Sequence, residues 1–211
     1  KIMNEERIGN KGYTHITTHD SVHHIVNHPA FEGFGNHILP WDDNTRYYDT
    51  PHNNVGSLMP YHSHVDPEFV VGAINHMIDL VSDGKTVFYD LYTNVQKQQD
   101  TNKRNTGLFF YQGFPDAPFA IVCPGGGFSY VGSLHEGFPL ALELSKKGYN
   151  AFVIRYRISS EQWAAEDLAA AIAFIFRNAE TLEVSTKDYS LWGGSAGARM
   201  VGDIALNGVS A

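Results

Sequence analysis

The chain has 211 residues, of which 43% are hydrophobic, so it is long enough to bury a sizeable core in a single domain. Its formal net charge of -8, with no visible cluster of Lys and Arg, argues against a nucleic-acid partner and against binding to a membrane surface. The single cysteine, Cys123, excludes an internal disulfide framework, and no apolar run approaches the roughly 20 residues of a membrane-spanning helix.

The first 65 residues are predicted to form an irregular N-terminal arm. They are rich in His, Asn, Gly, Pro and aromatic residues and show no sustained helical or strand period. Phe31, Phe34, Trp41 and other aromatic side chains would be left in water if this segment were free. We therefore expect the arm to pack over the rest of the chain, residues 66–211.

A helix is predicted directly after the arm. Asp66 is a suitable N-cap and Pro67 suits the first helical position. The predicted helix ends near Gly84. Its apolar face consists of Val70, Ile74, Met77, Ile78 and Val81.

The later elements are predicted in the order strand (86–93), loop (94–106), strand (107–112), strand (119–123), helix (137–147), strand (150–154), helix (163–178) and strand (189–192). The first two strands are expected to form a hairpin with a long connection. After Pro118, strands and helices alternate, which implies right-handed crossovers and a parallel sheet. The predicted fold class is therefore α/β, with a mostly parallel, doubly wound sheet covered on both faces.

The last predicted strand runs without a spacer into Gly193-Gly194-Ser195-Ala196-Gly197. This is the G-x-S-x-G nucleophile elbow, in which a serine sits at a sharp turn between a strand and a helix. Only small neighbours leave room at such a turn, and glycine tolerates its backbone angles. We predict Ser195 as a nucleophile; the alternative is a glycine-rich turn with a solvent-facing serine.

A second motif, Cys123-Pro124-Gly125-Gly126-Gly127-Phe128, follows the first strand of the parallel series, at the edge of the sheet where ligands bind. Acyl transfer develops negative charge on a carbonyl oxygen, and successive glycines let backbone N–H groups approach that oxygen. We predict an oxyanion loop here. A phosphate-binding loop and a purely structural turn are the alternatives, although the G-x-G-x-x-G spacing and the G-K-[ST] ending are missing.

Together the two motifs resemble the α/β-hydrolase fold, in particular the esterases and lipases whose oxyanion loop reads H-G-G-G. Pro124 stands where that group has histidine, a version similar to bacterial acetyl-esterase-like and carbohydrate-esterase-like members. The resemblance extends from Thr86 to the end of the chain. It implies that Ser195 is the nucleophile and that no cofactor or metal is needed. The oxyanion donors it implies are the N–H groups of Ala196 and of Gly126 or Gly127, and the residues lining the site are Gly125, Phe128, His135 and Gly194.

Tyr156-Arg157, followed by Asp167 at the start of a helix, also resembles this group. We interpret Arg157 and Asp167 as a structural ion pair that fixes the loop beside the site, with a catalytic role as the alternative.

The resemblance also implies an acid and a histidine after the nucleophile, in the order Ser, Asp or Glu, His. No histidine follows Ser195, so the 211 residues alone are expected to be nearly inactive. We expect that they are part of a longer protein, whose triad acid and histidine lie beyond Ala211. The competing explanation is that His135, with Glu136 beside it, substitutes as the base. Otherwise His135 is a helix-start residue that contacts solvent or the arm.

The arm contains histidines that could in principle hold a metal, namely His15, His19, His23, His24 and His28, together with Asp20. Nothing in the sequence fixes a helix there and no ligand spacing recurs, so scattered surface histidines and no metal site are predicted. His62 and His64 alternate as in an extended segment and are candidates to reach the mouth of the active site.

The predicted function is a serine hydrolase that cleaves a carboxylic ester through an acyl-enzyme, with a small-molecule substrate carrying a short acyl group such as acetyl on a sugar. A peptidase of the same fold is the first alternative, although Ala198 after Gly197 argues slightly against it. A catalytically silent protein that binds a carbohydrate or a partner protein is the second. The oligomeric state is not predicted. Localisation is left open between the cytoplasm and export from a bacterium, since the sequence begins at Lys1.

Overall fold

A computed structural model of the protein describes residues 12–42, 54–55 and 65–208. Its centre is a five-stranded sheet in the order β1-β2-β4-β3-β5. The strands are β1 (Phe88–Tyr89), β2 (Gly107–Tyr111), β3 (Ala117–Cys123), β4 (Asn150–Arg155) and β5 (Val184–Gly193). β3 pairs in parallel with β4 and β5, whereas β2 is antiparallel to both of its neighbours. The predicted α/β class with a mostly parallel sheet is confirmed.

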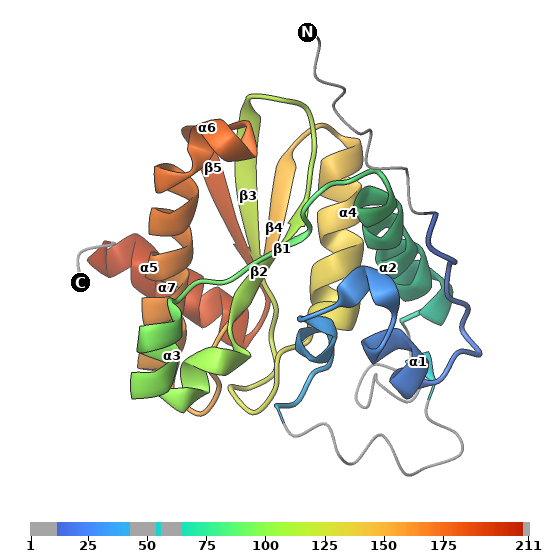
Figure 1. The fold of residues 1–211 in the computed structure, drawn as a ribbon. Coiled ribbons are helices and arrows are strands. Elements are labelled where there is room, and N and C mark those ends of the chain that lie inside the picture. Colours follow the sequence, from blue (N-terminus) through green and yellow to red (C-terminus); the bar gives the residue numbers. More distant parts are fainter. Residues whose placement is uncertain (1–11, 43–53, 56–64, 209–211) are drawn as a thin grey trace, which may run out of the picture.

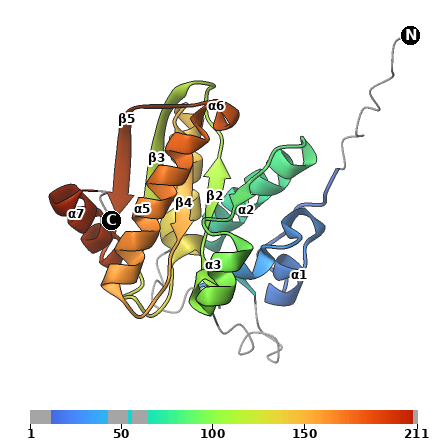
Figure 2. The same cartoon turned by 60° about the vertical axis from the view of Figure 1, so that its left-hand side comes forward.

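Helices cover both faces of this sheet (Figures 1 and 2). They are α1 (Val22–Val26), α2 (Pro67–Ser82), α3 (Asn94–Gln99), α4 (Phe138–Lys146), α5 (Glu161–Arg177), α6 (Ala179–Leu182) and α7 (Ala196–Asn207). α2 and α4 lie on one side, and α5 and α7 lie on the other. None of the described helices is long and apolar enough to cross a membrane.

Two hydrophobic cores result, one on each face of the sheet. Successive side chains of a strand point to opposite faces. Along β4, Ala151 and Val153 therefore belong to the core that α2, α4 and the arm cover. Phe152 and Ile154 belong to the core under α5 and α7. Because both faces are covered, residues 119–123 of β3 and 151–154 of β4 are continuously apolar, as the sequence of residues 119–123 indicated.

The predicted helix after the arm is confirmed as α2. The Asp66 side chain accepts a hydrogen bond from the Glu68 N–H at 2.9 Å, and Pro67 occupies the first turn. The other predicted helices and strands after residue 106 are also found. The largest difference is β5, which begins at Val184 rather than at residue 189.

The predicted loop over residues 94–106 is wrong, because the structure has α3 and a 3₁₀ helix, Thr101–Asn105, in this segment. Neither has a buried face that sequence periodicity would detect. The start of α3 is fixed instead by a capping box, in which Thr93 and Gln96 accept each other's backbone N–H groups. The strand expected over residues 86–93 is reduced to β1, which pairs antiparallel with β2 as the hairpin prediction required.

Residues 12–42 of the arm pack against the main domain. Ile16 lies in the core beside α2, and its backbone exchanges two hydrogen bonds with the Asn75 side chain, at 2.8 and 3.0 Å. The expectation of a wholly irregular arm is wrong, because Ser21 caps α1. Two 3₁₀ helices follow, Pro29–Phe31 and Gly35–Ile38.

The arm histidines differ in their environments. His28 is buried rather than at the surface: its Nε2 lies 2.7 Å from the Thr14 carbonyl oxygen, and its Nδ1 accepts the Ala30 N–H. His15 contacts Asp79 of α2 at 2.6 Å. Within residues 12–42, 54–55 and 65–208, no group of three or more His, Cys, Asp or Glu side chains is arranged to hold a metal ion. His62 and His64 lie outside the described residues.

Candidate active site

Ser195 occupies a tight turn between β5, which ends at Gly193, and α7, which begins at Ala196. Its φ of 51° and ψ of -119° lie outside the regions that residues with a side chain ordinarily adopt. The turn is closed by a hydrogen bond of 2.8 Å from the Gly197 N–H to the Gly194 carbonyl. The structure thus has the strand, turn and helix that the G-x-S-x-G motif predicts, with Ser195 exposed at its tip.

The glycines of the turn are required by close backbone contacts. A Cβ on Gly197 would lie 1.9 Å from the Cys123 carbonyl oxygen, and one on Gly193 would lie 2.5 Å from the Gly197 carbonyl carbon. Both distances are far below van der Waals contact. The small residues of the motif therefore allow the start of α7 to cross directly over the end of β3.

The glycine-rich loop after β3 is in contact with this turn. Parallel pairing sets Cys123 beside Gly193, so the two segments leave the sheet side by side. A Cβ on Gly125 would lie 2.9 Å from the Gly194 carbonyl oxygen and 3.2 Å from the Ser195 Cβ. The Tyr156 hydroxyl donates a hydrogen bond to the Pro124 carbonyl and so ties the loop to the end of β4.

The loop has an unusual backbone conformation beyond this contact. Gly126 and Gly127 have φ angles of 145° and 61°, and Phe128 also has a positive φ, of 56°. The Gly126 carbonyl accepts hydrogen bonds from Ser129 and Tyr130, and the Phe128 carbonyl accepts one of 2.6 Å from Ser159. The loop is thus a compact turn whose shape depends on glycine at two successive positions.

Ala196 is the first residue of α7, and its N–H is one of the four that an α-helix leaves without an intrahelical acceptor. The helix N-terminus also carries a partial positive charge. An oxygen that becomes negative next to Ser195 would lie near this end of α7. The arrangement is therefore suited to stabilising an oxyanion.

Glu136 is a site residue that the sequence analysis missed. It lies in a π-helical turn, Ser133–Gly137, and its Oε2 accepts the N–H of Gly125. The same oxygen is 2.8 Å from the position of a Cβ on Gly125 and 3.9 Å from that of one on Gly194. The carboxylate thus lies against both the glycine-rich loop and the turn of Ser195. An acidic residue shortly after the glycine run was the only signal in the sequence.

His135 is not the solvent-exposed helix-start residue that one interpretation expected. Its side chain is 1% exposed, and its Nε2 lies 3.9 Å from Glu136 Oε1. A Cβ on Gly132 would lie 2.8 Å from its Cε1. The residue of this pair that hydrogen-bonds to the glycine-rich loop next to Ser195 is therefore Glu136, through its carboxylate.

Arg157 and Asp167 form the structural ion pair that the sequence predicted. Arg157 Nη2 lies 2.9 Å from Asp167 Oδ1, and the Arg157 N–H donates to Asp167 Oδ2 at 2.7 Å. Tyr92 donates a hydrogen bond to the same carboxylate, and Asp100 and Glu166 also contact the guanidinium. Burial raises the pKa of Asp167, an effect that the hydrogen bonds from Arg157 and Tyr92 oppose. The cluster connects β4, α3 and α5 behind the site.

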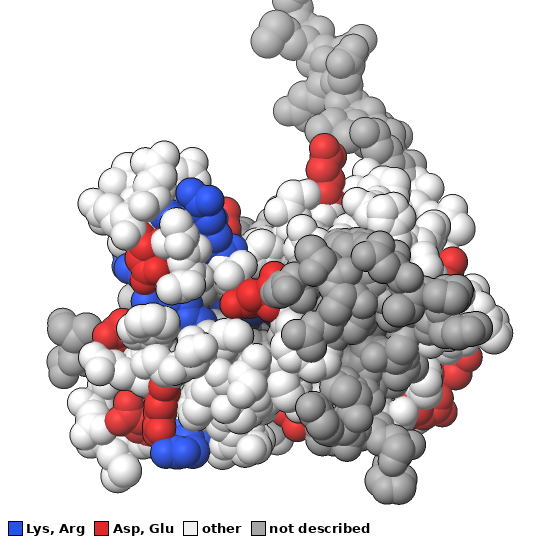
Figure 3. Space-filling model, turned by 90° about the horizontal axis from the view of Figure 1, so that it is seen from below, with Lys and Arg blue, Asp and Glu red and all other residues white. Residues whose placement is uncertain are grey.

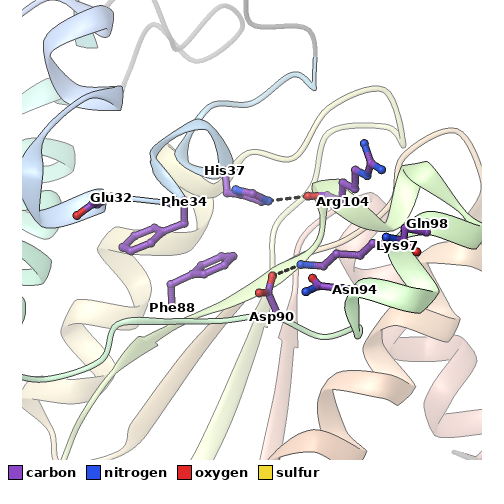
Figure 4. A pocket seen from close by; sticks show the side chains of 10 residues that line it. Glu32, Phe34, His37, Phe88, Asp90, Asn94, Lys97, Gln98 and Arg104 are labelled. Carbon is purple, nitrogen blue, oxygen red and sulfur yellow. Dashed lines mark hydrogen bonds and ion pairs between the residues drawn. The ribbon is translucent and has the colours of Figure 1, made fainter.

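Three adjacent cavities lie along the arm, with volumes of about 580, 590 and 250 Å³. All three are lined by His37, and we call them together the arm groove. The first lies between the arm, β1 and α3 (Figure 4) and is lined by Glu32, Gly33, Phe34, His37, Phe88, Asp90, Asn94, Lys97, Gln98 and Arg104. The smallest reaches Asp42 and Arg155, at the end of β4. None of these residues belongs to the turn of Ser195 or to the glycine-rich loop.

The end of the sheet that carries Ser195 is seen from below in Figure 3. On this face, basic and acidic side chains lie next to one another rather than in separate patches. Among the ion pairs of the described residues, Lys97 contacts Asp90 at 2.5 Å and Arg199 contacts Glu161 at 2.6 Å.

Comparison with known proteins agrees with this geometry. The BD-FAE family matches residues 112–210, which contain the glycine-rich loop and the turn of Ser195. A curated relative, endo-1,4-β-xylanase B of Butyrivibrio fibrisolvens, is 33% identical over 93 residues, which are 41% of this chain and 14% of that protein. This chain thus covers only a small part of the relative's length.

Two solved structures are similar over about half of the chain, each at 27% identity. One is MGS-M1, an α/β-hydrolase enzyme from a deep-sea metagenome library of the Medee basin, with a TM-score of 0.46 over 49% of this chain and 47% of the other. The second is an acetyl ester-xyloside bifunctional hydrolase from Caldicellulosiruptor lactoaceticus, with a TM-score of 0.48 over 54% and 44%. The sheet and the two motifs give the chain an α/β-hydrolase fold, and residues 112–210, just under half of the chain, are similar to the BD-FAE family.

Proposed function

We propose that the protein of which this sequence is a part is a serine hydrolase that cleaves carboxylic esters through an acyl-enzyme. The observation that carries the proposal is the contact between two backbone features. An exposed serine with strained φ and ψ angles lies directly against a glycine-rich loop and at the start of a helix. Such a combination supplies a nucleophile and hydrogen-bond donors for an oxyanion in one place.

In the proposed reaction, the Ser195 Oγ attacks the ester carbonyl carbon while a histidine takes the hydroxyl proton. The negative oxygen of the tetrahedral intermediate accepts hydrogen bonds from the N–H of Ala196 and from that of Gly126 or Gly127. The C–O bond to the alcohol then breaks, and the histidine returns the proton to the leaving oxygen. A water molecule, deprotonated by the same histidine, attacks the acyl-serine ester; the bond between the acyl carbon and Ser195 Oγ breaks, the histidine returns the proton to Oγ, and the acid is released.

The histidine and its acid partner follow the nucleophile along the chain in this fold. We assign neither role to a described residue. Glu136 has a different part in the proposal: its carboxylate holds the Gly125 N–H and thereby sets the position of the loop relative to Ser195. We refer to it as a positioning residue.

For the substrate, we propose an ester of a short acyl group, such as acetyl, with a carbohydrate. The BD-FAE match supports an ester of this class, and the name of the curated relative, a xylanase, supports a plant polysaccharide as the alcohol part. The small-molecule p-nitrophenyl acetate then serves as a simplified substrate that retains the acyl group.

The test uses the full-length protein and its Ser195→Ala variant. We expect a fluorophosphonate probe to label the wild-type protein at Ser195 and p-nitrophenyl acetate to be hydrolysed, with both signals lost in the variant. A protein that is neither labelled nor active would refute the proposal and favour a silent binding protein. Labelling with cleavage of peptide amides but not of esters would favour the peptidase alternative.

A further inference from the structure

We propose that the arm groove binds the carbohydrate chain of the substrate at a distance from the ester, as a site for an uncharged, hydroxyl-rich ligand. This inference rests on the proposed function for its substrate class. Its own basis is the position of the groove, the unpaired polar groups that line it and the balance of its charges.

The groove opens at the same end of the sheet as Ser195. Asp90 directly follows β1, and Arg104 lies shortly before the start of β2. Because β2 is antiparallel to β4, its first residue, Gly107, pairs with Arg155 at the carboxyl end of β4. The Ser195 turn follows β5, which lies three strands away from β2 in the sheet. With neighbouring strands about 4.8 Å apart, the part of the groove beside the start of β2 is on the order of 14 Å from the nucleophile. A ligand that reaches both places has to be a chain rather than a single sugar.

The groove is lined by polar side chains that have no partner in the described part of the protein. They are the carboxylate of Glu32, the amides of Asn94 and Gln98 and the guanidinium of Arg104. Figure 4 shows that they come from three separate segments, namely the arm, α3 and the segment before β2. A sugar hydroxyl both donates and accepts a hydrogen bond. A chain of hydroxyls therefore matches a groove that carries amides, a carboxylate and a guanidinium at separate points along its walls.

The charges of the groove favour a neutral ligand. In its first cavity two acidic side chains accompany two basic ones, and Lys97 is paired with Asp90 at 2.5 Å. In the smallest cavity, Asp42 is paired with Arg155 at 2.9 Å. A polyanion or a polycation would find no net opposite charge here.

The walls of the groove are held in place before any ligand binds. His37 Nε2 lies 2.8 Å from the Arg104 carbonyl oxygen, which joins the arm to the 3₁₀ helix before β2. The Phe34 and Phe88 rings are stacked, with centroids 4.8 Å apart and an interplanar angle of 6°, and join the arm to β1. A cavity of about 580 Å³ with walls of this kind is in the size range of small-molecule sites, and a preformed wall lowers the ordering cost of binding.

The test measures binding of xylotetraose to the full-length Ser195→Ala protein by titration calorimetry. We expect saturable binding. Adding Asn94→Ala and Gln98→Ala should weaken it about tenfold, since the loss of two hydrogen bonds of modest strength corresponds to about that factor. Gln99→Ala is the matched control, because it removes an exposed amide of the same helix that does not line the groove. Its dissociation constant should equal that of the parent.

A second measurement uses the catalytically intact protein. The ratio of kcat/KM for acetylated xylotetraose to kcat/KM for p-nitrophenyl acetate should fall about tenfold in the Asn94→Ala/Gln98→Ala variant and stay constant in Gln99→Ala. An unchanged ratio together with unchanged xylotetraose binding would overturn the groove proposal. If p-nitrophenyl acetate is not hydrolysed at all, the proposed function fails, and the calorimetric result still decides about the groove.

Discussion

Glu136 provides the sharpest test of how the site is built, because one carboxylate oxygen contacts the loop that lies against Ser195. Replacing it by alanine removes the acceptor of the Gly125 N–H, which is a buried group. An unsatisfied buried N–H costs about 1 to 3 kcal/mol, so the loop is expected to shift toward water or another acceptor.

The effect on activity follows from what the loop does. A misplaced oxyanion donor costs at most about as much as a missing one, which is roughly 2.7 to 4 kcal/mol of transition-state stabilisation. We therefore expect Glu136→Ala to lower kcat for p-nitrophenyl acetate by about 10- to 1000-fold with little change in KM. Glu136→Gln keeps an oxygen that accepts the same N–H, and it should retain activity within about fivefold of wild type.

The assay compares kcat, KM and the rate of fluorophosphonate labelling for the full-length wild type and the two variants. Glu143→Ala, an exposed acid of α4 that pairs with Lys146, is the control for the loss of a negative charge. Thermal unfolding of each variant separates a loss of activity from a loss of fold. Full activity of Glu136→Ala would refute the reasoning. Equal loss in both variants would mean that the charge of Glu136, rather than its hydrogen bond, is what matters.

Three further outcomes test other parts of the structure. Gly197→Ala places a methyl group 1.9 Å from the Cys123 carbonyl oxygen, so we expect it to lower the free energy of unfolding by roughly 1 to 3 kcal/mol and to abolish labelling of Ser195. Asp167→Asn leaves Arg157 without its buried partner and should cost about 3 to 5 kcal/mol, measured by urea unfolding. Burial and the nearby Arg155 lower the pKa of His37 below its ordinary value of 6.5. The unfolded chain therefore takes up a proton before the folded one does. The free energy of unfolding should therefore decrease as the pH falls below about 6.5, and it should decrease less in a His37→Gln variant, as measured by urea unfolding at several pH values.

The sequence predicted those parts of the fold that depend on periodic burial or on backbone conformation. α2 was recognisable from its cap and apolar face, and the Ser195 turn from residues that few other structures tolerate. α3 was missed because it buries no face, and only the Thr93 and Gln96 caps mark it. The helix α1 was missed for a similar reason, since five residues are too few to show a period.

The parts of the candidate site that lie within one local motif could be predicted from the sequence. The contacts between residues distant in the sequence could not. The contact of Gly125 with the turn of Ser195 depends on the parallel pairing of β3 with β5, which a single sequence does not reveal. Glu136 was named only as a neighbour of His135, because nothing local distinguishes an acid that reaches back to a glycine N–H from one in solvent. His28 was expected at the surface, since its burial depends on contacts with Thr14 and Phe31 in the folded arm.

If the protein has the proposed function, the pairing of Cys123 with Gly193 affects which parts of it can change in sequence during evolution. The spacing between Ser195 and the glycine-rich loop is set by backbone register, and the Glu136 carboxylate and the Tyr156 hydroxyl hold the loop in place. The described part of the arm contacts the segment that follows this loop: the Val131 N–H donates a hydrogen bond of 2.9 Å to the Pro40 carbonyl, and the Trp41 ring contacts the Tyr130 ring. If the arm groove binds the alcohol part of the substrate, as proposed, substitutions in the arm would alter which alcohols are accepted while the geometry around Ser195 stays the same. On the proposed function, selection for a new polysaccharide would act on the arm and leave the turn of Ser195 and the glycine-rich loop unchanged.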